Sequence, residues 1–206
     1  WNALNGSPEF ENYLRFADQA LPVGTQEDSA ALDALQRLAS IGDGLPTQLP
    51  PSAGELDPLF FALYASEQGG QLITSLASLR HTLDTGSEML EQRQQNRPLC
   101  PTGQPTPRGR ILQNIFIKFY AGGLQPYLAQ VDQRGQQWQA ALLQLQPIAG
   151  IPPATRMHLQ HLAGEQDSLW QDFRAATARH VKAWQTLLNS CGLAPGQAGW
   201  NNAVES

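Results

Sequence analysis

The stretch ATRMHLQHLAGEQDSLWQDFRAATARHVKAWQTLLNSC, residues 154–191, decides the fold of this chain of 206 residues. Its core-type side chains recur every three or four positions and fall in one narrow arc when about 100° is added per residue. They are Leu162, Leu169, Phe173, His180, Trp184, Leu187 and Cys191. Gly164 is the one interruption, and Gly192 stands where a helix C-cap favours glycine. The pattern predicts one long helix with a single side facing the core.

The rest of the sequence predicts further helices and no strand. Ser7, Pro8 and Glu9 form a helix start: a hydroxyl cap, proline in the first turn, and an acidic side chain at the positive end of the helix dipole. Periodic apolar residues indicate helices over roughly 8–20, 28–42, 59–66, 70–96, 108–122 and 126–146. We therefore expect an all-α protein, an irregular helical bundle of about six or seven helices, in a single domain over residues 1–206.

The middle of the chain combines a rigid loop with a very apolar helix. Prolines at 98, 101, 105 and 107 remove backbone donors and predict an extended loop near the middle of the bundle. The segment 108–122 that follows is apolar on almost every side, which is typical of a helix buried at the centre of a bundle. The pair Gly122 and Gly123 predicts a break before the next helix opens at Pro126.

Composition and charge exclude some classes of function. The net charge is −5 and the chain has two lysines, so we expect no binding to nucleic acid. No stretch approaches the roughly 18 uninterrupted apolar residues that a membrane-spanning helix needs. Neither a GxSxG or SxxK motif nor a glycine-rich phosphate loop is present. We therefore expect no enzymatic activity, no catalytic residue and no cofactor.

The histidines offer two possible sites, and the structural interpretation is favoured for both. On a helix, His158, His161 and Glu165 would share one edge and could bind a metal, but they lack the HExxH pattern and a fourth ligand. We expect a solvated helix edge there and no metal site. His180 lies in the apolar arc, either as a buried acid–base group or, as we favour, as a core histidine satisfied by one hydrogen bond.

Three other features carry structural expectations. Asp84 and Glu88 stand four residues apart, which predicts an exposed helical face with mild repulsion between like charges. Trp1 and Trp200, near the two ends, are expected to fold back onto the core. Cys100 and Cys191 form either a disulfide or two free thiols; a loop and a helix end allow adjustable geometry, which favours the disulfide.

The proline-rich loop is the candidate binding segment. Pro105 and Pro107 stiffen the chain, and Arg108 and Arg110 supply positive charge at the start of the apolar helix. A rigid extended segment loses little entropy on binding, which suits a docking role. The alternative is a plain crossover connection held by the disulfide.

Three blocks of the sequence resemble one family. They are WNALNGSPEF (1–10), LCPTGQPTPRGRILQNIFIKFYAGGLQPYLA (99–129) and HVKAWQTLLNSCGLAPG (180–196). Together they resemble an uncharacterised family of gammaproteobacterial lipoproteins, domain of unknown function 3080, in its C-terminal two-thirds. The resemblance favours a native origin of residues 6–10 over a cloning scar. It also implies further cysteines upstream, which leaves open whether Cys100 and Cys191 pair with each other.

The resemblance implies an exported protein on the periplasmic side of the bacterial envelope, lipid-anchored to the outer membrane through a segment outside this chain. Our leading hypothesis is a non-enzymatic binding or scaffold module that contacts another envelope protein through the proline-rich loop. A second hypothesis is a periplasmic carrier of a lipid or other apolar ligand, with the helix around 111–120 lining a cavity. A third is a cell-wall or carbohydrate hydrolase, which requires converging carboxylates with perturbed pKa values.

Overall fold

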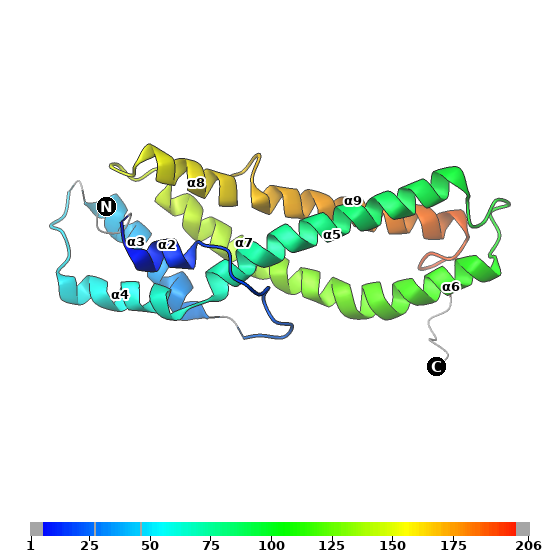
Figure 1. Cartoon of the computed structure of the whole chain (residues 1–206), viewed down its shortest axis with the longest axis horizontal. Helices are drawn as coiled ribbons and strands as arrows, with labels where there is room; N and C mark the ends of the chain where they lie inside the picture. Colours follow the sequence, from blue (N-terminus) through cyan, green and yellow to red (C-terminus); the bar gives the residue numbers. More distant parts are fainter. Residues whose placement is uncertain (1–5, 27, 46, 201–206) are drawn as a thin grey trace. The chain divides into compact units, whose positions relative to one another are not determined.

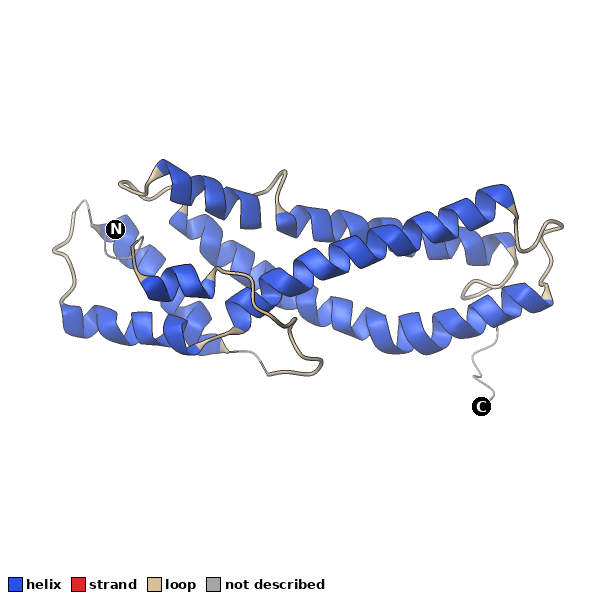
Figure 2. Ribbon diagram, in the orientation of Figure 1, coloured by secondary structure: helices blue, strands red, loops and turns tan. Residues whose placement is uncertain are grey.

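The computed structural model describes residues 6–26, 28–45 and 47–200. Within these ranges every regular element is helical, which confirms the all-α prediction (Figure 2). The elements are α2 (Pro8–Tyr13), α3 (Ser29–Gly44), α4 (Ala53–Ala65), α5 (Gln68–Asn96), α6 (Pro107–Ile115), the π-helix η1 (Phe116–Leu124), α7 (Gln125–Leu145), α8 (Pro153–Ala163) and α9 (Leu169–Ser190) (Figure 1). Since α6, η1 and α7 are continuous, the described chain holds seven helices, within the predicted range.

The contacts of the chain define two compact units. The first contains the described residues up to Ser78 together with 130–173, and the second contains 79–129 together with the described residues from Arg174 onward. Helices α5, α7 and α9 each supply one segment to each unit. The single domain over residues 1–206 stays a prediction beside this division. None of the helices within the described ranges has the length and apolar character needed to cross a membrane.

Helix α2 begins as predicted and ends earlier. The Ser7 hydroxyl accepts a hydrogen bond from the Phe10 amide at 3.1 Å, which confirms the cap. The helix stops at Tyr13 rather than near residue 20, because the chain after it pairs with α5 instead. The Ala17 amide donates to the Gly70 carbonyl at 3.4 Å, and the Thr74 hydroxyl donates to the Ala17 carbonyl at 2.8 Å.

Helix α4 begins six residues before the predicted start at 59, because of a capping box that the sequence analysis missed. The Ser52 amide donates to the Glu55 carboxylate at 2.8 Å, and the Ser52 hydroxyl caps the same turn. This start lets α4 pack against both α2 and α3 in the first unit.

The predicted helix over residues 154–191 is two helices. Gly164 ends α8, and α9 begins at Leu169 after a turn in which Asp167 adopts a positive φ of 50°. The Ser168 hydroxyl accepts from the Gln171 amide at 3.2 Å and so caps α9. The arc predicted for the core is buried with the exception of Leu169, which is half-buried.

The predicted break at Gly122 and Gly123 is wrong. The helix continues through both glycines as η1, whose wider turns replace the usual four-residue hydrogen bonds with five-residue ones, and runs on into α7. A glycine costs about 1 kcal/mol relative to alanine inside a helix, which weakens a helix without ending it.

The core of the first unit contains Trp170, which is fully buried and packs against Phe173 with 5.8 Å between ring centroids. Gly135 of α7 lies against the Trp170 ring, and a Cβ atom at position 135 would overlap three of its carbon atoms. This close approach explains why a glycine stands in the middle of α7 despite its helix cost.

We predict that Gly135→Ala lowers the unfolding free energy by about 1–3 kcal/mol, because the buried ring has nowhere to move. Gly54→Ala is the matched control, since a Cβ atom there meets nothing within 4 Å in the first turn of α4. Urea unfolding of both variants checks the prediction. A Gly135→Ala protein as stable as the control would show that Trp170 does not pack as described.

Candidate functional site

A disulfide joins Cys100 to Cys191 in the second unit, with 5.1 Å between the Cα atoms. This confirms the pairing that the sequence analysis favoured. Both cysteines are buried, and Gly109 lies directly beside them: a Cβ atom there would sit 3.0 Å from the Cys100 sulfur and 3.4 Å from that of Cys191. The start of α6 is therefore packed against the bond itself.

The candidate arginines lie on α6 and not in the proline-rich loop. The Thr106 hydroxyl accepts from the Gly109 amide at 3.1 Å and donates to the Leu99 carbonyl at 2.9 Å, so the loop ends at Thr106. Pro107 is the first residue of the helix, the position at which a missing amide costs nothing. Pro105 is half-buried, whereas Pro107, Arg108 and Arg110 are exposed.

One side of α6 and η1 is fixed against the rest of the second unit. Gln113 is buried, and its side-chain amide donates to the Leu193 carbonyl at 3.1 Å. Phe116 packs on Trp184 with 5.2 Å between ring centroids and on Tyr120 with 5.3 Å. Trp200 lies 6.4 Å from Phe116, so this terminal tryptophan does fold back, whereas Trp1 lies outside the described residues.

The opposite side of the same helix is exposed, and we call it the outer face. Its apolar members are Ile111, 61% exposed, Ile115, 42% exposed, and Phe119, 62% exposed, and its cations are Arg108 and Lys118. The prediction of a helix buried on every side is therefore wrong. The contact with the unit is made by Gly109, Gln113, Phe116 and Tyr120, which leaves the outer face exposed among the described residues of this unit.

The charge of this region differs in sign from that of the whole chain. Residues 97–131 contain Arg97, Arg108, Arg110 and Lys118 and not a single acidic residue, whereas the chain carries −5 in total. The Lys118 ammonium lies 5.6 Å from the centre of the Phe119 ring, which joins charge and apolar surface in one patch. Arg110 also has a structural role, because it donates to the Gly199 carbonyl at 3.3 Å.

Behind the outer face, His180 is a buried core residue with two hydrogen bonds rather than the one predicted. The Trp184 indole donates to His180 Nε2 at 3.0 Å, so Nδ1 carries the proton and donates to the Ser87 hydroxyl at 3.2 Å. That hydroxyl in turn donates to the Leu83 carbonyl at 2.6 Å. Burial lowers the pKa of His180, which favours the neutral imidazole that this chain of hydrogen bonds requires.

Two further groups of side chains were singled out in the sequence. His158, His161 and Glu165 are exposed, and the described part of the chain contains no cluster of side chains fit to hold a metal ion. Asp84 and Glu88 do share a face, but the mild repulsion predicted between them was inferred without Arg179, which lies beside both. Arg179 Nη1 lies 3.4 Å from Asp84 and 3.9 Å from Glu88, and Arg179 binds Glu91 with two hydrogen bonds.

The outer face was not predicted from the sequence, although one signal for it was present. The gap in acidic residues from 97 to 131 marks a cationic surface and is visible in the sequence. The exposure of Ile111, Ile115 and Phe119 is not visible in the sequence. An apolar helix has the same residue pattern whether it packs against its own chain or against another.

These features define an all-α protein with a disulfide-anchored, cationic and apolar helical face. Residues 1–195 match the family described as protein of unknown function, DUF3080, and the chain belongs to that family. The match covers nearly the whole chain, including both units. No curated protein and no solved structure matches the chain.

We predict that loss of the disulfide lowers the unfolding free energy by about 4–5 kcal/mol, since the bond closes a loop of 91 residues in the unfolded chain. Calorimetry with and without a reductant should show a fall in melting temperature of roughly 10 °C. The double variant Cys100→Ala, Cys191→Ala should melt at the lower temperature, and the reductant should not change its melting temperature. Two titratable thiols per chain in unfolded, unreduced protein would disprove the bond.

A second prediction concerns the pH dependence that His180 contributes. The pKa of His180 in the folded protein lies below the value of about 6.5 in the unfolded chain. As the pH falls below that value, the unfolded state therefore binds a proton that the folded state does not bind. The unfolding free energy should fall by up to about 1.4 kcal/mol per pH unit in this window.

Urea unfolding between pH 7.5 and 5.5 measures this loss in the native protein and in His180→Gln, which cannot titrate. The native protein should lose more stability than the variant. His161→Gln, at an exposed histidine, is the matched control and should behave as the native protein does. Equal losses in the native protein and His180→Gln would contradict a neutral, buried His180.

Proposed function

We propose that this chain is a non-enzymatic binding module of the bacterial envelope, which docks onto an acidic partner protein through the outer face of α6 and η1. The observation that carries the proposal is the alignment of Ile111, Ile115 and Phe119, exposed one helical turn apart on a helix whose other side is fixed. A row with this spacing is what an apolar groove on a partner recognises in a helix.

The positive charges of the outer face favour a partner with acidic side chains. Arg108 and Lys118 flank the apolar row, and the segment 97–131 lacks acidic residues that would neutralise them. Carboxylates around an apolar groove would complement this pattern, steer the encounter and fix the register of the helix. Three apolar anchors with a charged rim match the small central cluster that dominates the energy of protein interfaces.

The disulfide and the family together support the location. Disulfides persist in oxidising compartments such as the periplasm and are rare where thiols are kept reduced. We propose, as the resemblance to gammaproteobacterial lipoproteins implies, that the full-length protein lies on the periplasmic side of the outer membrane and is held there by a lipid anchor. An anchored module with one exposed face suits a scaffold for another envelope protein.

The alternative functions have less support. In the helix that a carrier would use, Phe116 and Tyr120 contact other rings and Ile111 faces solvent, an arrangement unlike the lining of a ligand cavity. For a hydrolase, carboxylates would have to converge with a raised pKa on the general acid. Arg179 lies close to three acidic side chains, but it lowers the pKa of Glu91, whereas a general acid needs a raised pKa.

The test is a photo-cross-linking amino acid at Asn114, which is exposed on α6 beside the outer face, in the full-length protein in its native cells. We expect one acidic partner, lost from the double variant Arg108→Glu, Phe119→Ser with at least about a tenfold fall in affinity. Arg110 stays unchanged, because its bond to Gly199 would confuse binding with folding.

The double variant Arg37→Glu, Met157→Ser is the matched control: both side chains are exposed, and both lie in the first unit. It should retain the partner, and binding of the native protein should weaken as salt rises. Absence of any cross-linked protein, or a partner that survives the outer-face variant, would contradict the proposal. Binding to vesicles of anionic lipid with the same dependence on Phe119 would replace the protein partner with a membrane surface.

A further inference from the structure

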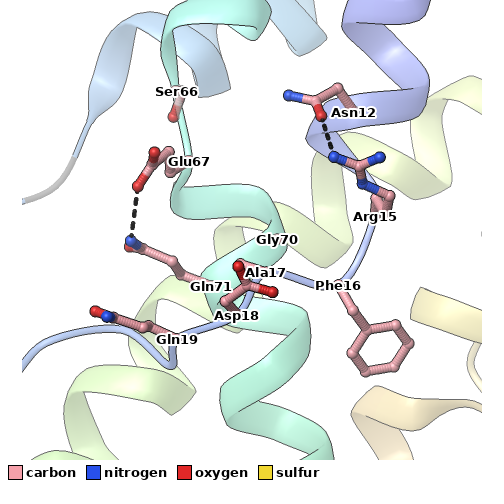
Figure 3. A pocket seen from close by; sticks show the side chains of 10 residues that line it. All are labelled: Asn12, Arg15, Phe16, Ala17, Asp18, Gln19, Ser66, Glu67, Gly70 and Gln71. Carbon is pink, nitrogen blue, oxygen red and sulfur yellow. Dashed lines mark hydrogen bonds between the residues drawn. The ribbon is translucent and has the colours of Figure 1, made fainter.

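The first unit contains an open cleft of about 400 Å³, lined by residues 12, 15–19, 66–67 and 70–71 (Figure 3). Its volume lies within the range of roughly 300–1,000 Å³ that small-molecule sites occupy. Arg15 and Asn12 lie on one side in the view, Glu67 and Gln71 on the other, and Asp18 lies between them. The cleft belongs entirely to the first unit and is separate from the outer face.

The floor of the cleft is built as a rigid surface. A Cβ atom on Gly70 would overlap the Arg15 carbonyl, so only glycine allows the segment 14–18 to lie this close to α5. Thr74 and Gly70 both hydrogen-bond to the backbone of Ala17, and the Ser75 hydroxyl accepts from the Leu21 amide at 2.9 Å. The segment is therefore irregular in secondary structure and still fixed in position.

Phe16 is exposed on this fixed segment. Its side chain is 60% exposed, whereas its neighbours Tyr13 and Leu14 are 5% exposed and form part of the core. The hydrogen bonds that fix Ala17 also fix the backbone beside Phe16, so the aromatic ring is presented at the edge of the cleft by the fold. An exposed aromatic ring held in place offers a flat apolar surface to a ligand.

The other walls carry planar polar groups that are already positioned. The Arg15 guanidinium donates to Asn12 Oδ1 at 2.9 Å, and the Gln71 amide donates to Glu67 Oε2 at 3.3 Å. These pairs leave further donors on Arg15 and further acceptors on Glu67, and Asp18 and Gln19 add both kinds. The cleft thus offers several hydrogen-bonding groups, with the Phe16 ring at its edge (Figure 3).

We infer that this cleft binds a short, uncharged saccharide. Sugar rings combine adjacent hydroxyls, which bond to planar amide, guanidinium and carboxylate groups, with a face of C–H bonds that packs on an aromatic ring. Arg15, Asp18 and Glu67 sum to one negative charge, which disfavours an anionic ligand. The cleft is also too polar for a purely apolar one.

The test is a titration of the whole chain, labelled with nitrogen-15, with triacetylchitotriose, maltotriose and trigalacturonate, followed by amide chemical shifts. At least one of the two neutral sugars should shift amides of residues 12–19 and 66–71 with a Kd on the order of 1 mM. Trigalacturonate, which carries carboxylates, should bind more weakly than that sugar.

Two variants give the inference its controls. Phe16→Ala should weaken binding at least about tenfold without unfolding the protein, because the ring is exposed. Phe61→Ala removes a ring that is 68% exposed on α4 of the same unit and should leave binding unchanged. Cleft amides that ignore both neutral sugars, shifts that survive Phe16→Ala, or tighter binding of trigalacturonate would each overturn the inference. None of these results bears on the partner of the outer face.

Discussion

The disulfide between Cys100 and Cys191 is the constraint on which the second unit depends. It ties the loop before α6 to the end of α9, and Gly109 then packs directly on its sulfur atoms. The bond from Gln113 to the Leu193 carbonyl repeats the same connection one turn later. Because these contacts hold one side of α6 in place, the other side stays exposed in a defined orientation, which is what a docking surface requires.

Local signals predicted most of the helices. The Ser7 cap and the long α5 follow from spacing and capping rules that act within a few residues. Gly164 was expected only to interrupt one long helix, whereas it ends α8. Predictions were wrong where contacts between distant residues determine the end of a helix. Helix α2 ends at Tyr13 because the residues after it pair with Gly70 and Thr74, more than fifty positions away. Capping rules consider only neighbouring residues and therefore do not include such a partner. In η1 the helix continues through Gly122 and Gly123, because the helix cost of a glycine, about 1 kcal/mol relative to alanine, weakens a helix without ending it.

The candidate sites were predictable only in part. The cysteines and the arginines were identified from their residue types. The structure pairs the cysteines and has Arg108 and Arg110 in the first turns of α6, the helix at whose start they were expected. The outer face and the saccharide cleft both depend on which apolar side chains stay exposed, and composition does not report exposure. Phe16 and Phe119 look like core residues in the sequence, yet each lies beside a fixed backbone segment and faces solvent.

Hydrogen exchange at the amides of residues 108–119 tests most directly whether the disulfide holds the outer face. The comparison is between the native protein and the variant Cys100→Ser, Cys191→Ser under conditions in which both are folded. Our account predicts that protection falls across these amides in the variant, while the amides of residues 68–78 in the first unit keep theirs. Unchanged protection at 108–119 would show that the face is held without the bond and would contradict the account.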